Sequence, residues 1–133
     1  MIVVDTNIIS YLYLPTEFTT QAENLLLQEV EWVVPVLWRS EFRNVLALYI
    51  RKNLLSFEQA CFIQNKAEVL FEGREFNLDS YDILQLIKDS DCSSYDCEFV
   101  ALAKRLEVRL ITMDKKLLST FPKIAFSLIS VQH

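Results

Sequence analysis

The sequence predicts an α/β fold with a central, mostly parallel sheet that helices cover on both faces. Two observations lead to this class. The apolar runs expected to form strands are short and continuous instead of alternating with polar residues, which is typical of strands buried on both faces. Longer segments with helical spacing separate these runs. No internal repeat, low-complexity segment or linker interrupts the pattern, so we expect one domain over residues 1–133.

The first half of the chain opens with an apolar strand over residues 2–5. The segment 8–14, IISYLYL, is apolar nearly all round, as expected for a helix that is deeply buried or covered by another chain. Residues 16–30 have helical spacing, and a second strand, WVV, closes at Pro35. Because proline suits the first turn of a helix, we predict a helix over 36–52 and another over 55–72.

In the second half, residues 74–77 are compatible with a short edge strand or a loop. Helices are predicted over 80–89 and 94–107, followed by a clear strand over 108–112. A helical turn over 115–119 and a final strand over 125–131 complete the pattern.

Composition excludes several classes of function. The chain has a single glycine, Gly73, whereas P-loops and dinucleotide-binding fingerprints need several. The three cysteines, Cys61, Cys92 and Cys97, are an odd number, and the first residues do not resemble a secretory signal. We therefore expect reduced thiols in a cytoplasmic protein without a membrane span. A zinc site is not expected, because the cysteines are isolated and the one histidine is His133.

Two aspartates follow predicted strands directly. Asp5 ends the first strand, and Asp114 lies just past the strand VRLIT. The carboxyl ends of parallel strands meet at one edge of a sheet, where ligands of open α/β folds bind. The alternative for each residue is a helix cap, a common role of aspartate at such a position.

A third acid, Glu41, lies within the apolar face of the predicted helix 36–52. A carboxylate in such a position must be paired, protonated or bound to a cation. The alternative to a functional site is a salt bridge with a neighbouring arginine. The predicted apolar face consists of Leu37, Trp38, Phe42, Val45, Leu48 and Tyr49.

A fourth acid, Asp96, shares the apolar face of the predicted helix 94–107 with Phe99, Val100 and Ala103. Glu98 is expected to project the other way, as an ordinary surface acid. A capping box from Ser93 to Asp96 would explain an acid in the first turn without catalysis. It would not explain why this acid points inward.

Four inward or edge carboxylates would repel one another at neutral pH, and a hard divalent cation would remove this repulsion. Mg²⁺ and Mn²⁺ prefer carboxylate oxygens, retain waters and commonly bind the phosphate oxygens of a substrate. Such a centre lowers the pKa of a bound water and stabilises charge on a phosphate during transfer.

The ordered set Asp5 in IVVDTN, Glu41 in RSEFRNVL, Asp96 in SSYDCEFVALAKRL and Asp114 in LITMD resembles the PIN-domain nucleases, specifically VapC-type toxins of toxin–antitoxin pairs. The resemblance extends from residue 2 to about residue 131. It implies a three-layer α/β/α PIN-like fold, Mg²⁺- or Mn²⁺-dependent cleavage of RNA, and a metal site formed by these four acids.

The same resemblance implies further residues and partners. Thr6 and Asn7 flank the first acid and Thr112 precedes the last, so their side chains are candidates to orient waters or carboxylates. A small antitoxin is expected to wrap helices such as 8–14, and homodimerisation is usual for the family. We expect Glu41 or Asp114 to orient the attacking water, with one or two ions at the site.

The charge of the chain is unusual for a protein that binds RNA. Its formal net charge is −5, and residues 1–38 contain no lysine or arginine. Some local positive potential must therefore offset the acids. The candidates near the predicted site are Arg39 and Arg43 on the Glu41 helix, and Lys115 and Lys116 directly after Asp114.

Two other classes of function stay open. A haloacid-dehalogenase-type phosphatase would have a second aspartate where Asn7 stands, and a receiver domain would have adjacent acids where Asp5 stands alone. A non-catalytic binding module on the same fold would not need all four acids.

Overall fold

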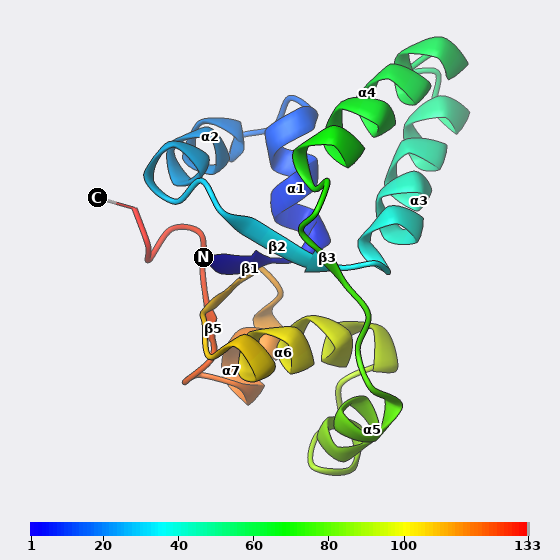
Figure 1. Ribbon diagram of the computed structural model, residues 1–133. Helices are drawn as coiled ribbons and strands as arrows, with labels where there is room; N and C mark the ends of the chain where they lie inside the picture. The colour runs from blue at the N-terminus through cyan, green and yellow to red at the C-terminus, as the bar shows by residue number, and fades with distance from the viewer. Residues whose placement is uncertain (133) are drawn as a thin grey trace.

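A parallel sheet forms the middle layer of the protein. The computed structural model describes residues 1–132, and within them the strands have the order β3-β2-β1-β4-β5, with every neighbouring pair parallel. Helices α1 to α4 cover one face, and α5 to α7 cover the other (Figure 1). This arrangement confirms the predicted α/β/α class. The strands are β1 (Ile2–Val4), β2 (Trp32–Pro35), β3 (Glu75–Phe76), β4 (Leu110–Ile111) and β5 (Ala125–Phe126).

The helices follow the sequence prediction closely, except at their ends. The segment 75–76 forms the edge strand β3, which settles the choice between strand and loop. The helices are α1 (Thr6–Tyr13), α2 (Thr19–Gln28), α3 (Trp38–Arg51), α4 (Phe57–Leu70), α5 (Ser80–Lys88), α6 (Ser94–Leu106) and α7 (Lys115–Thr120).

Helix α2 is shorter than the predicted 16–30. The Thr16 hydroxyl accepts a hydrogen bond from the Phe18 N–H, and the Thr19 hydroxyl accepts one from the Thr16 N–H. These local bonds hold residues 16–18 in a turn and delay the helix to Thr19. At the other end, the backbone of Glu29 is extended.

The predicted final strand over 125–131 is mostly wrong, because pairing stops after Phe126. The Ser127 hydroxyl accepts from the Ser130 N–H at 3.0 Å, and the Ser130 hydroxyl donates to the Ser127 carbonyl at 2.9 Å. Serine side chains thus hold a turn where the apolar pattern predicted a ladder. Leu128 and Val131 are nevertheless buried, which explains the misleading pattern.

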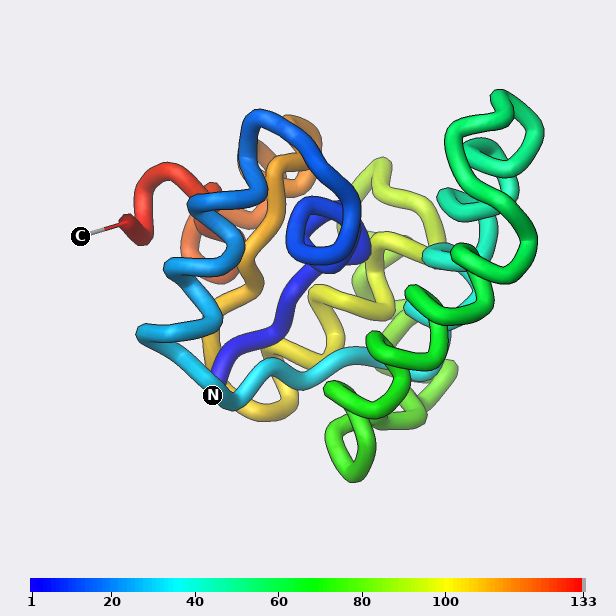
Figure 2. Tube along the Cα trace, turned by 90° about the horizontal axis from the view of Figure 1, so that it is seen from above, coloured from blue at the N-terminus to red at the C-terminus, as the bar shows by residue number. Residues whose placement is uncertain are grey.

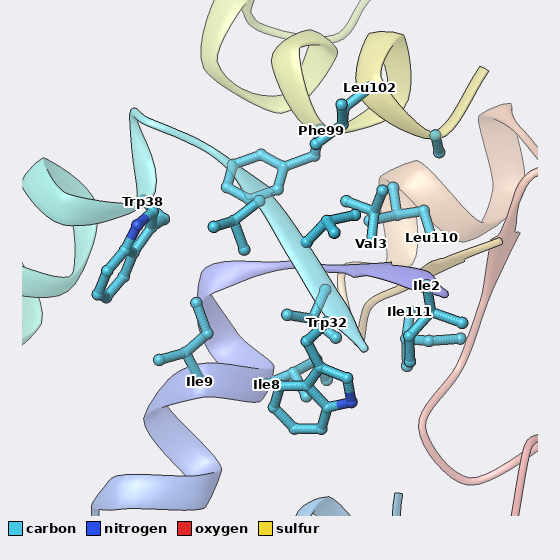
Figure 3. Packing of buried hydrophobic residues seen from close by; sticks show 14 of the residues in the cluster. Ile2, Val3, Ile8, Ile9, Trp32, Trp38, Phe99, Leu102, Leu110 and Ile111 are labelled. Carbon is cyan, nitrogen blue, oxygen red and sulfur yellow. The ribbon is translucent and has the colours of Figure 1, made fainter. Parts of the chain in front are cut away.

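The core lies on both sides of the sheet, and β1 runs through its centre. Figure 3 shows Phe99 and Leu102 of α6 packed on one side of β1, with Ile8 and Ile9 of α1 on the other. Ile8 and Ile9 are fully buried. The chain's own core therefore accounts for much of the apolar segment 8–14, whereas residues 11–13 stay partly exposed. Cover by an antitoxin over this helix stays a prediction.

Helices α3 and α4 form a hairpin, here called the helical arm, that extends past the sheet (Figure 2). It carries exposed apolar side chains along its length. Among the helices of residues 1–132, none combines the length and the apolar character needed to cross a bilayer. The exposed apolar residues of the arm are Leu48, Leu54, Phe57, Phe62 and Val69.

Candidate acidic site at the carboxyl edge of the sheet

Asp5 is held rigidly at the carboxyl end of β1. Its backbone N–H donates to the Ile111 carbonyl of β4, which continues the ladder by one residue. Its Oδ1 accepts from the Thr6 N–H at 2.8 Å, and its Oδ2 accepts from the Thr112 hydroxyl at 2.7 Å. The residue is only 7% exposed. Burial raises the pKa of Asp5 to about 6, although both hydrogen bonds oppose this rise.

Glu41 reaches the same edge from the first turn of α3, which begins shortly after β2 ends. Its Oε1 accepts from the Thr6 hydroxyl at 2.7 Å, and the side chain is half-buried. Burial raises the pKa of Glu41, and the charges of Asp5, Asp96 and Glu98 raise it further. Within residues 1–132 Glu41 forms no salt bridge, so the arginine-pair alternative is wrong.

Asp96 lies in the first turn of α6 and is half-buried. The Ser93 hydroxyl accepts from the Asp96 N–H at 3.1 Å, so Ser93 caps the helix through the backbone of Asp96. In the part of the chain that the structure describes, the reciprocal bond of a full capping box is not formed. Burial and the charge of Asp114 raise the pKa of Asp96. The cap therefore exists, and the Asp96 carboxylate nevertheless lies within electrostatic reach of Asp5, Glu41 and Asp114.

Asp114 has two structural roles in addition to its place at the edge. It is the N-cap of α7, where its Oδ1 accepts from the Leu117 N–H at 3.0 Å. Its own N–H donates to the Thr112 hydroxyl at 3.0 Å. The expected helix cap is thus present. The Asp114 charge also raises the pKa of both Asp5 and Asp96, which places all of these carboxylates within electrostatic reach.

A continuous hydrogen-bonded path joins three of the acids through two threonines. It runs from Glu41 to the Thr6 hydroxyl, from the Thr6 N–H to Asp5, and from Asp5 through the Thr112 hydroxyl to the Asp114 N–H. Thr6 and Thr112 are themselves buried. Both threonines donate to carboxylates of the site, and their role in orienting these ligands stays a prediction. Asn7, by contrast, is exposed and forms no side-chain hydrogen bond within residues 1–132.

Two expectations about α3 and α6 need correction. Leu48 is 47% exposed and Leu46 is buried, because the second half of α3 leaves the sheet to join the helical arm. Glu98 is half-buried and raises the pKa of Glu41, so it is not an ordinary surface acid. The packing of α5 against α6 covers the side of the helix that the sequence alone left in solvent.

The basic residues predicted to face RNA have different surroundings. The Arg39 guanidinium donates to both oxygens of Glu75, at 2.7 and 2.8 Å, and to Glu68 at 3.0 Å. The Arg39 side chain therefore joins α3 to β3 and α4, and these two glutamates already bind its guanidinium. Lys116 donates to the Asp91 carbonyl at 2.6 Å, and its charge lowers the pKa of Asp96. Arg43 and Lys115 are exposed.

The donor set of this edge suits a hard divalent cation. Its acids supply oxygen ligands, and the pKa of Asp5 is raised mainly by burial and further by the charges of Asp96 and Asp114, two costs of the ionised form that a bound cation would offset. Among residues 1–132, no three acidic, thiol or imidazole side chains are close enough together to bind one ion jointly. One or two carboxylates with waters and phosphate oxygens are the usual ligands of Mg²⁺, and the residues present fit that arrangement. A direct ligand role for all four acids stays a prediction.

Comparison with known proteins identifies the family to which this chain belongs. The PIN-domain sequence pattern matches residues 2–126. Ribonuclease VapC3 of Pyrobaculum aerophilum is 32% identical over 92% of this chain and 96% of that protein. FitAcB from Neisseria gonorrhoeae superposes with a TM-score of 0.76 at 19% identity, over 98% of this chain and all of that one. A toxin–antitoxin complex from Klebsiella pneumoniae gives a TM-score of 0.70 at 14% identity, over 96% and 98% of the two chains. The chain therefore belongs to the PIN-domain family and is similar to its VapC-type ribonucleases, as its four acidic motifs predicted.

Proposed function

We propose that this PIN-domain protein is an endoribonuclease that hydrolyses RNA phosphodiester bonds with Mg²⁺ or Mn²⁺, and that it is the toxin of a toxin–antitoxin pair. One observation supports the proposal above all: the buried Asp5 lies within electrostatic reach of Asp96 and Asp114 at one edge of the sheet, and burial, with a smaller contribution from these charges, raises its pKa to about 6. The similarity to Ribonuclease VapC3 supports RNA as the substrate.

The chain's own residues would bind the ion and prepare the attack. Asp5 would be a ligand of the ion, and its contacts with Thr6 and Thr112 hold the carboxylate in place without the ion. Glu41 and Asp96 complete the acidic surroundings. When bound, the ion would supply an activated water and offset the charge that develops on the phosphate.

Either Glu41 or Asp114 would orient the water. Each of these carboxylates has one oxygen engaged within residues 1–132, Glu41 Oε1 by the Thr6 hydroxyl and Asp114 Oδ1 by the Leu117 N–H. The raised pKa of Glu41 favours Glu41, because it suits a group that accepts a proton from water.

The helical arm supports the partner proposal. Its exposed apolar side chains include Phe57 and Phe62. Exposed apolar surface of this kind is typical of a site that binds another protein. We expect a small antitoxin or a second copy of the chain to cover this surface, with homodimerisation as the expected state. The neighbouring structures that contain toxin–antitoxin complexes support such a partner. The three cysteines are free thiols, which agrees with a cytoplasmic location.

Cleavage of single-stranded RNA in the presence of Mg²⁺ or Mn²⁺ tests the proposal directly. We expect the activity to stop in EDTA and to be lost in Asp5→Asn, whereas the matched variant Asp82→Asn, an exposed acid on α5, retains it. Undiminished cleavage in EDTA would exclude the metal. Turnover of a small phosphorylated molecule alone would favour the phosphoryl-transfer alternative, and folded protein without any turnover would favour a binding module.

A further inference from the structure

A basic recess lies at the amino edge of the sheet, opposite the acids. It has a volume of about 610 Å³ and is formed where α6 ends, β4 begins and β5 starts. Its charged side chains are Lys104, Glu107, Arg109 and Lys123, and Ile124 and Phe126 supply apolar surface. Met1 also lines it, but its terminal amine is paired with Glu29. Below it is called the amino-edge recess.

The recess concentrates unpaired positive charge in a protein whose net charge is −5. Lys104, Arg109 and Lys123 are all exposed, and none forms an ion pair within residues 1–132. Glu107 is the one acid that lines it. Three cations against one anion give the local positive potential that a polyanion needs.

Several cations elsewhere are engaged. Arg39 is bound by Glu68 and Glu75, and Lys116 is bound by the Asp91 carbonyl. Arg74 and Arg105 donate to the carbonyls of Val30 and Asn77. Arg43 and Lys115, beside the acids, are exposed, but they lie on separate helices, whereas the amino-edge recess brings three exposed cations together.

The recess also combines charge with an apolar wall. The Arg109 guanidinium carbon lies 6.0 Å from the centre of the Phe126 ring, and Ile124 is partly exposed beside it. A chain that alternates phosphates with flat, partly apolar bases can use both features, whereas an acidic peptide would use mainly the charge.

The recess is linked to the acidic site by the short strand β4. Arg109 precedes this strand and Asp114 follows it, so the two residues are at most about 16 Å apart along an extended chain. A single RNA strand that passes around the edge strand β5 can therefore contact both. The acids repel a polyanion, and the recess would offset that repulsion.

We infer that the amino-edge recess binds backbone phosphates of the RNA whose scissile bond lies at the acidic site, an inference that rests on the proposed function. Lys104, Arg109 and Lys123 are then binding residues that act on affinity and not on the chemical step.

The test compares two double variants in an Asp5→Asn background, with fluorescence anisotropy of a labelled oligouridylate over a range of salt concentrations. Arg109→Gln with Lys123→Gln removes two charges from the recess. Arg51→Gln with Lys52→Gln removes the same two residue types from the exposed tip of the helical arm. We expect the recess variant to bind several-fold more weakly, with a log–log salt slope smaller by about 1.4 for two lost phosphate contacts. The arm variant should match its parent.

Equal affinity and slope in the two variants would overturn the inference. It would also be overturned if the recess variant lost binding to polyglutamate alone, which would assign the recess to an acidic protein.

A cleavage assay separates failure of this inference from failure of the proposed function. With the wild-type Asp5 restored, the recess variant should cleave a dinucleotide at the parent's rate and show a raised KM only on the longer RNA. If the parent cleaves both RNAs and the recess variant is unimpaired on each, the proposed nuclease function is supported and RNA binding at the recess is rejected. If the parent cleaves no RNA, yet the recess variant alone loses oligouridylate binding, RNA binding at the recess is supported and the proposed nuclease function is rejected.

Discussion

The Thr112 hydroxyl donates to Asp5 Oδ2 at 2.7 Å and so joins two residues that are 107 positions apart in sequence. The same hydroxyl accepts from the Asp114 N–H at 3.0 Å. A single buried hydroxyl thus holds the side chain of Asp5 and the backbone of Asp114. The geometry of the site depends on this threonine as much as on the acids themselves.

Thr112→Val should lower both stability and metal affinity. The substitution preserves shape but leaves a buried Asp5 oxygen without its donor and the Asp114 N–H without its acceptor. A loss of roughly 1–3 kcal/mol in the free energy of unfolding follows from an unpaired buried polar group. Because the Thr112 bond opposes the rise in the pKa of Asp5, that pKa should rise further in the variant. Urea unfolding and Mn²⁺ titration measure the two effects.

Thr112→Ser provides the control, since it retains the hydroxyl and removes only a methyl group. It should stay close to the wild type in Mn²⁺ affinity. If valine and serine variants bind Mn²⁺ equally well, the hydroxyl does not position Asp5.

The stability of the metal-free protein should depend on pH through Asp5. Its pKa is about 6 in the folded protein and 3.8 ordinarily, so the folded state takes up the proton first as the pH falls. The contribution to stability is full below about pH 4 and is lost as the pH rises through 6. This difference corresponds to roughly 3 kcal/mol. In EDTA, the wild type should therefore unfold at a higher temperature at pH 5 than at pH 7.

Asp5→Asn should remove most of this pH dependence and stabilise the metal-free protein at pH 7. Glu41 and Asp96, whose pKa values are also raised, would leave a smaller dependence of the same sign. Identical pH profiles for the wild type and Asp5→Asn would contradict the prediction.

Asp96→Asn should abolish cleavage without loss of stability in EDTA. The substitution retains the backbone N–H that Ser93 caps, and it removes the repulsion with Asp114. Ser93→Ala should do the opposite, with a cost of about 0.5–2 kcal/mol in the free energy of unfolding and catalysis preserved. Thermal unfolding and RNA cleavage of both variants separate the two roles, and an inactive Ser93→Ala or a destabilised Asp96→Asn would contradict the assignment.

Arg39→Gln should weaken the fold without changing the salt dependence of RNA binding. The guanidinium joins α3 to β3 and α4 through Glu75 and Glu68, and hydrogen bonding to Arg39 lowers the pKa of Glu75. A partly exposed pair of this kind contributes on the order of 1 kcal/mol. A flatter salt slope in anisotropy measurements would instead return Arg39 to the RNA-binding surface, as its sequence position suggested.

The sequence was sufficient for the acids and for most elements because these depend on local pattern. Continuous apolar runs predicted β1, β2 and the strand after α6, and the acids followed from their places at strand ends and on helix faces. The strand predicted over 125–131 failed because serine hydroxyls compete for the backbone after Phe126. The spacing of apolar residues does not show whether serine side chains will bond to the backbone.

The hydrogen bonds that connect the acids could not be predicted from the sequence, because they depend on how separate elements pack together. The bond from Thr6 to Glu41 depends on how α1 and α3 pack, and not on the spacing of either residue. The capture of Arg39 likewise depends on the approach of β3, which could not be distinguished from a loop. Leu48 was misplaced because a helical wheel does not show where a helix leaves the sheet.

The central position of β1 has a consequence for the order of synthesis. β1 precedes both of its neighbours, β2 and β4, in the chain, and the second of them begins at Leu110. Asp5 cannot bond to the Ile111 carbonyl or the Thr112 hydroxyl until the segment that contains β4 has also left the ribosome. A nascent chain that ends before β4 therefore cannot assemble the acidic edge, so synthesis itself delays the formation of this site.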